Sequence, residues 1–214
     1  MIYIYGDSYA CPIHRVNENP DIVTWYKRLE ERYLVTNKAV MGAGADYAYK
    51  EYLQDEENFT DVDKVIFIHS LARRMNWFGL NPFSQNEIKF EKGRTSVGEW
   101  AIESTLQFVR KHDKEIEYVN NHYDYNLKFD SSVFEKALVL KHIAQSKNVK
   151  TYYMVVHPRD WQVLQKYHSL MENNEWFSLY YKPLLNLNYD LNLRNHLSQE
   201  QHNSLYSEVL DFIE

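Results

Sequence analysis

The sequence has one cysteine, Cys11, among its 214 residues, so no intramolecular disulfide can form. It has no run of roughly 18 apolar residues, the length that a membrane-spanning helix needs. Residues 1–10 lack the basic and apolar regions of a signal peptide. Basic residues are not in excess, since 24 Lys and Arg against 30 Asp and Glu give a net charge of −6. This balance argues against nucleic acid or an anionic membrane as partner, and we expect a cytoplasmic protein.

Glycine is also scarce, with six residues, and no phosphate-binding loop is visible. The segment 42–45 (Gly-Ala-Gly-Ala) lacks the third glycine and the following helix pattern of a dinucleotide site. The histidines show no paired spacing with cysteine or carboxylates that would suggest a metal site. We therefore expect no metal and no organic cofactor.

What the chain does contain is typical of a globular protein, with 44% hydrophobic and 25% charged residues. Its length fits a single domain over residues 1–214. Strand-like and helix-like segments alternate, which favours an α/β fold in which helices cover both faces of a mostly parallel sheet. Strands are predicted at 1–5, 34–40, 64–68 and 149–156, and helices at 19–33, 47–53, 97–111, 131–146 and 198–213. Residues 71–98 resemble a long aromatic loop, and 160–195 are not assigned.

The tripeptide Gly6-Asp7-Ser8 directly follows the first predicted strand. In open α/β sheets, ligands bind at the carboxyl ends of the strands. A serine there can project into the cleft while its N–H points at a developing oxyanion. An ordinary turn explains the same three residues, because all of them favour turns.

A histidine, His196, lies just before the last predicted helix, whose N-cap is Ser198. Serine needs a base to become a good nucleophile, and histidine is the usual one. His202, inside that helix, is an alternative base, although its helical position should turn it away from Ser8 or behind the site. Cys11 is either a neighbour of the site or a buried structural thiol.

Together these segments resemble the GDSL/SGNH hydrolase family, and in particular its divergent, phage-borne members. The resemblance rests on Gly6-Asp7-Ser8, on Gly42 after the second strand, and on His196-Leu197-Ser198. It implies a three-layer α/β/α sandwich with a flavodoxin-like sheet. It also implies that Ser8 is the nucleophile and His196 the base. The N–H groups of Ser8 and Gly42 would form the oxyanion hole, and Asp7 would be one of the oxyanion or substrate-binding residues.

Two departures from the family pattern change what is expected. The usual Gly-x-Asn-Asp block is replaced by residues 68–74, in which Arg73 or His69 would supply the missing donor or bind an anionic substrate group. A surface ion pair explains Arg73 equally well. In the family the triad acid lies three residues before the histidine, and Leu193 occupies that position here. The acid is therefore Asp190, or it is absent and a Ser–His dyad remains. Loss of that carboxylate can cost about 10⁴ in kcat.

The expected function is hydrolysis of a small ester, such as an O-acetyl group on a saccharide, through an acyl-enzyme on Ser8. An aromatic loop at 75–90 would cover the cleft and stack on a sugar ring. The alternative is a non-catalytic binding protein that kept the fold and lost the activity. A nucleotide-binding module would need an acidic cluster or phosphate loop that the sequence does not have.

Overall fold

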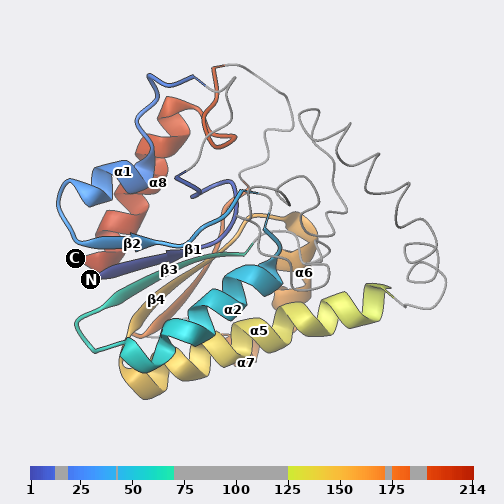
Figure 1. Ribbon diagram of the computed structural model, residues 1–214. Helices are drawn as coiled ribbons and strands as arrows, with labels where there is room; N and C mark the ends of the chain where they lie inside the picture. Colours follow the sequence, from blue (N-terminus) through green and yellow to red (C-terminus); the bar gives the residue numbers. More distant parts are fainter. Residues whose placement is uncertain (13–18, 42, 70–124, 172–174, 184–191) are drawn as a thin grey trace, which may run out of the picture.

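The computed structural model describes residues 1–12, 19–41, 43–69, 125–171, 175–183 and 192–214 (Figure 1). The predicted helix at 131–146 lies within a longer helix, Tyr125–Lys147. The predicted helix at 97–111 and the predicted aromatic loop lie outside the described residues.

A five-stranded sheet, parallel throughout, forms the centre of the described structure. The order β2-β1-β3-β4-β5 is that of flavodoxin-like doubly wound sheets, in which ligands bind beside the first strand at the point where the strand order reverses. The chain makes that reversal between β1 and β3, which pair directly with Tyr5 opposite Phe67. The strands are β1 (Ile2–Tyr5), β2 (Val35–Asn37), β3 (Lys64–His69), β4 (Lys150–Val155) and β5 (Phe177–Tyr181).

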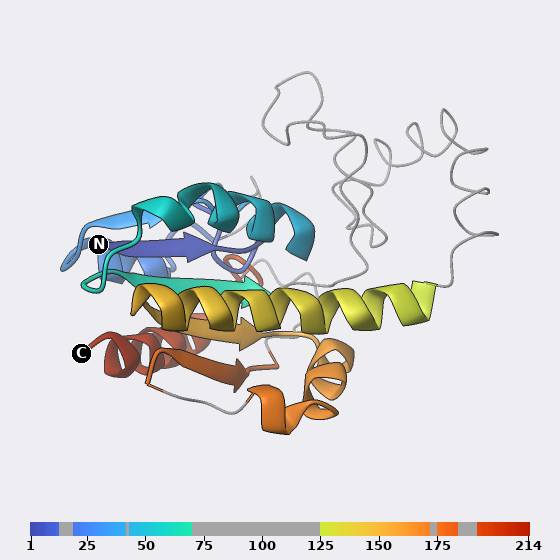
Figure 2. The ribbon, with the colours of Figure 1, turned by 90° about the horizontal axis from the view of Figure 1, so that it is seen from below.

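Helices cover both faces of this sheet. Figure 1 shows α1 (Trp25–Glu30) and α8 (Gln199–Ile213) on one face, and α2 (Ala45–Asp55) and α5 (Tyr125–Lys147) on the other. In Figure 2 the latter pair lies in front of the strands, and both chain termini lie at the amino end of the sheet. The shorter helices are η1 (Glu56–Asn58), α6 (Pro158–Gln165) and α7 (His168–Met171). The α/β class predicted from the alternating segments is thus confirmed.

Two hydrophobic cores follow from the alternation of side chains along each strand. Ile4 and Ile66 point toward the face of α1 and α8, where Leu205 completes the packing. Tyr5 and Phe67 point to the opposite face. A central strand buried on both faces reads as a continuous apolar run, which is why Lys64–His69 could be assigned from sequence.

The first helix begins at Trp25, later than the predicted residue 19. Asn19 Oδ1 accepts the Asp21 N–H at 2.9 Å, a local contact that competes with helix formation. Val23 is held by Gln199 of α8, which accepts from its N–H and donates to its carbonyl. These contacts keep the chain non-helical up to the N-cap, Thr24.

The last helix begins as predicted. Ser198 is its N-cap, accepting from the Gln201 N–H, while the Gln201 side chain accepts from the Ser198 N–H. This reciprocal capping box fixes the start of α8. No helix in the described part of the chain is long and apolar enough to cross a membrane.

Candidate active site

The structure brings Ser8 and His196 together, with 3.0 Å between Ser8 Oγ and His196 Nε2. Ser8 follows β1 at its carboxyl end, and His196 lies two residues before Ser198, the N-cap of α8. This separation is within the range for a nucleophile and its general base. The juxtaposition predicted from the two ends of the sequence is therefore confirmed.

A tight turn over residues 7–10 carries Ser8. The Asp7 carbonyl accepts the Ala10 N–H at 3.1 Å, and Asp7 Oδ1 accepts the Tyr9 N–H at 3.2 Å. Asp7 is 1% exposed, so the turn is fixed by a buried carboxylate. These contacts give Asp7 a structural part in holding Ser8.

Gly6 allows this turn to begin close to the neighbouring strand. A Cβ at position 6 would lie 2.9 Å from the Cβ of Ile68, and the φ of Gly6 is 157°. Since such a contact is shorter than real Cβ atoms show, any side chain here would push β1 away from β3. The glycine of the Gly-Asp-Ser motif is thus required by packing.

The Ser8 N–H makes no hydrogen bond within the described part of the chain. In serine hydrolases, an oxyanion hole requires a backbone N–H donor of this kind beside the nucleophilic serine. The predicted second donor, Gly42, lies outside the described residues.

A two-residue turn presents His196. Arg194 and Leu197 exchange two backbone hydrogen bonds of 3.0 and 2.9 Å, and the central residues Asn195 and His196 have φ values of 53° and 64°. Positive φ at both positions is typical of a tight hairpin turn, and Asn and His tolerate it better than most residues. The His196 ring packs against Tyr9, with 5.4 Å between ring centroids.

The neighbours of His196 anchor this turn to the segment that follows Ser8. Asn195 Nδ2 donates to the Cys11 carbonyl at 2.8 Å, and the Tyr26 hydroxyl donates to the same carbonyl at 2.9 Å. Arg194 Nη1 donates to the carbonyls of Pro20 and Ile22, at 2.9 Å each. Cys11 is buried, and its backbone carbonyl links α1 to the turn.

The sequence did not reveal these anchoring residues. Asn195 directly before His196, next to a capped helix, is the one local signal of a positive-φ turn. The partners of Arg194 and Asn195 are backbone carbonyls, which any residue type supplies. A pattern of side chains therefore cannot point to them.

His69 was predicted as an oxyanion or substrate-binding residue, and the structure gives it other partners. The ring is fully buried at the end of β3, with Nδ1 2.6 Å from the Tyr153 hydroxyl and Nε2 3.3 Å from Asp160 Oδ2. Burial and the nearby Asp160 raise the pKa of the Tyr153 hydroxyl well above its ordinary value. The Nδ1 of His69 thus pairs with Tyr153, whereas its buried Nε2 faces Asp160 and makes no hydrogen bond among the described residues.

The other predicted site residues, Arg73 and Asp190, lie outside the described residues. Leu193, in the slot of the triad acid, is buried, and its carbonyl accepts the Asn19 N–H at 3.3 Å. Within the described ranges, no group of three or more His, Cys, Asp or Glu side chains is arranged to hold a metal ion.

Comparison of the chain with protein-family models gave no match, and comparison with curated proteins gave none either. The interpretation of the site therefore depends on its own geometry.

Proposed function

We propose that the protein is a serine hydrolase that cleaves a small carboxylic ester, with Ser8 as nucleophile and His196 as general base. The observation that carries this proposal is the 3.0 Å contact between Ser8 Oγ and His196 Nε2 at the carboxyl end of β1. The resemblance of Gly6-Asp7-Ser8 and His196-Leu197-Ser198 to the GDSL/SGNH hydrolases supports it. In this proposal the sheet and the helices on its two faces form an SGNH-type α/β/α sandwich.

In the first half-reaction, Nε2 of His196 removes the Ser8 proton as Oγ bonds to the ester carbonyl carbon. The carbonyl π electrons move to oxygen, and the resulting oxyanion accepts a hydrogen bond from the Ser8 N–H. The tetrahedral intermediate collapses when the bond to the leaving alcohol breaks. Protonated His196 returns its proton to that alcohol, leaving an acyl group on Ser8.

Water then hydrolyses the acyl-enzyme, and His196 again acts first as a base and then as an acid. His196 takes a proton from water, whose oxygen bonds to the acyl carbon, and the bond to Oγ then breaks. Ser8 regains its proton from His196, and the carboxylic acid leaves. Neither half-reaction needs a metal or an organic cofactor.

The rigid turn supports catalysis by a dyad as well as by a triad. In a triad, the acid holds the imidazole in the correct orientation. Here the double hydrogen bond between Arg194 and Leu197 already fixes the backbone on both sides of His196. Asp190 remains the candidate acid, Gly42 and Arg73 the candidate oxyanion donors, and an O-acetylated saccharide the candidate substrate.

Hydrolysis of p-nitrophenyl acetate by the purified protein and by Ser8→Ala tests this proposal. Ser207→Ala is the matched control, because Ser207 is exposed on α8, away from the dyad. We expect the parent and the control to hydrolyse the ester and Ser8→Ala to lose at least 10³ in kcat. Equal rates in all three proteins, or a folded parent without activity, would contradict it, and the second result would favour a binding protein.

A further inference from the structure

His202 lies on α8, six residues after His196, and its side chain is fully buried. Its two ring nitrogens contact backbone groups from different parts of the chain. Nδ1 lies 3.3 Å from the N–H nitrogen of Trp25, and Nε2 lies 2.9 Å from the Arg194 carbonyl oxygen. His202 thus joins the start of α1 to the turn that carries His196.

The partners of His202 define the tautomer that fits both contacts. The Trp25 N–H is a donor, so Nδ1 has to accept and carries no proton. The Arg194 carbonyl is an acceptor, so Nε2 carries the proton and donates. The neutral ring protonated at Nε2 satisfies both groups, and it also supplies a partner to the first N–H of α1, which Thr24 does not cap through its side chain.

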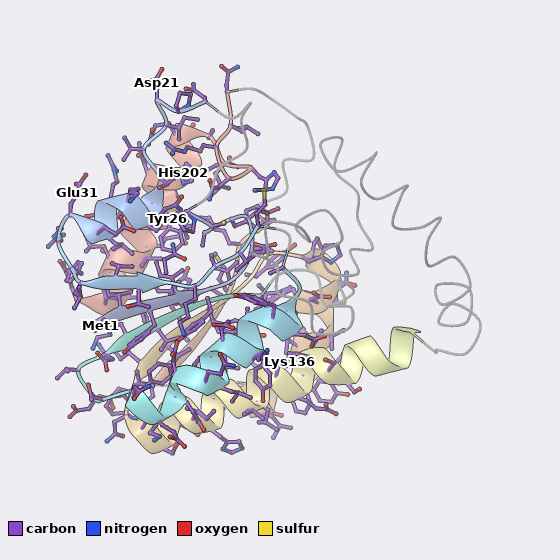
Figure 3. All side chains as sticks on the ribbon, in the orientation of Figure 1. Met1, Asp21, Tyr26, Glu31, Lys136 and His202 are labelled. Carbon is purple, nitrogen blue, oxygen red and sulfur yellow. The ribbon has the colours of Figure 1, made fainter. Side chains whose placement is uncertain are left out.

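Trp25 extends this connection to the other side of the dyad. Its indole Nε1 donates to the Tyr9 carbonyl at 3.1 Å, one residue after Ser8. The chain of contacts therefore runs from Tyr9 through Trp25 and His202 to Arg194. Figure 3 labels His202 and Tyr26, which lie on the neighbouring helices α8 and α1.

We propose that His202 is a positioning residue for catalysis: by holding the Arg194 carbonyl, it fixes the His196 turn at the distance from Ser8 that proton transfer requires. The inference rests on the proposed hydrolase function. His202 touches no reacting atom in this account and acts through Arg194, two residues before His196. A misplacement of about 1 Å at a reacting group can cost about 10²-fold in rate, so the loss of this contact should affect kcat.

Two substitutions separate the positioning contact from the structural one. Gln places its amide nitrogen near the position of Nε2, so His202→Gln keeps the donor to Arg194 and loses the acceptor for Trp25. Asn places its amide oxygen near the position of Nδ1, so His202→Asn keeps the acceptor for Trp25 and loses the donor to Arg194. His142→Asn is the control, because His142 is exposed on α5.

The experiment measures kcat and KM for p-nitrophenyl acetate per folded molecule, together with urea unfolding of each protein. We expect His202→Asn to lower kcat by about 10- to 100-fold with KM within roughly twofold. His202→Gln should keep kcat within about threefold of the parent and unfold at lower urea. Equal kcat in both variants, or failure of both to fold, would identify a purely structural residue and overturn the proposal.

A spectroscopic measurement tests the positioning role of His202 separately from the proposed hydrolase function. If the parent protein hydrolyses nothing, the hydrolase proposal fails. The nitrogen-15 shift of His196 Nε2 still reports its contact with Ser8 Oγ in each variant. That shift should change in His202→Asn and stay close to the parent in His202→Gln; an unchanged shift in both would contradict the positioning role.

Discussion

The side-chain amide of Asn195 donates to the Cys11 carbonyl at 2.8 Å, joining residues that are 184 positions apart in the chain. This contact fixes the residue before His196 to the segment that follows Ser8. The geometry of the dyad therefore depends on a long-range hydrogen bond as well as on the sheet.

Asn195→Asp should destabilise the fold because it replaces the amide donor by a second acceptor facing the Cys11 carbonyl. Asp tolerates positive φ about as well as Asn, so the turn itself is not at issue. We expect urea unfolding to show a loss of about 1–3 kcal/mol, the usual cost of leaving a buried group unsatisfied. Asn203→Asp is the control, since Asn203 is exposed and uses its oxygen to accept from Gln199. A similar loss in both variants would show that the Cys11 contact contributes nothing.

His196→Asn should end hydrolysis and cost little stability. Asn is favoured at positive φ, and the φ of His196 is 64°. We expect the free energy of unfolding to fall by less than about 1 kcal/mol, whereas His196→Val should lose roughly 1–2 kcal/mol more, because a β-branched residue is strained there. Equal stability of the two variants in urea would argue against a strained turn.

Gly6→Ala should destabilise the fold because its Cβ would meet Ile68 at 2.9 Å. Overpacking of this kind costs about 1–3 kcal/mol. Ser8 follows two residues later, so the kcat for p-nitrophenyl acetate per folded molecule should also fall. If Gly6→Ala unfolded at the same urea concentration as the parent, β1 and β3 would have room for a methyl group at this point.

The buried hydroxyl of Tyr26 should make the free energy of unfolding depend on pH in the alkaline range. Burial raises the pKa of its hydroxyl to about 12, whereas in an unfolded chain it is about 10. Between these values the unfolded chain loses the proton and the folded chain keeps it. Ionisation therefore favours unfolding, so this contribution to stability is constant below pH 10 and falls as the pH rises from 10 to 12.

Tyr26→Phe isolates this contribution. Below pH 10 the parent should be more stable by about 1 kcal/mol, from the hydrogen bond to the Cys11 carbonyl. Urea unfolding at several values of pH should show this advantage shrinking from pH 10 to 12. An advantage that stays constant or grows over that range would contradict the buried, protonated hydroxyl.

The strongest local patterns predicted the fold. The apolar interior of Lys64–His69 indicated a buried strand, and Ser198 before an amphipathic segment indicated the start of α8. The strand Phe177–Tyr181 was not assigned, because it is short, lies at the sheet edge and is buried mainly at its first residue. The helix before it, α7, is also short.

The candidate site could be predicted only in part. Ser8 and His196 were found because each lies beside a recognisable strand or helix end. The contacts of Asn195 and His202 could not be predicted, since each joins a backbone group far away in the sequence: the Cys11 carbonyl for Asn195 and the Trp25 N–H for His202. His69 was assigned to the site because it ends a strand, but its side chain turns toward Tyr153 and Asp160.

The most direct test of the central claim is covalent labelling by a fluorophosphonate, followed by intact-mass and peptide analysis. A serine reacts with this probe only when a neighbouring base activates it. We predict one adduct per chain, on Ser8, and its absence or strong reduction in both Ser8→Ala and His196→Asn. A folded protein that remains unlabelled, or that is labelled equally in the His196→Asn variant, would contradict the account of Ser8 and His196 as a catalytic pair.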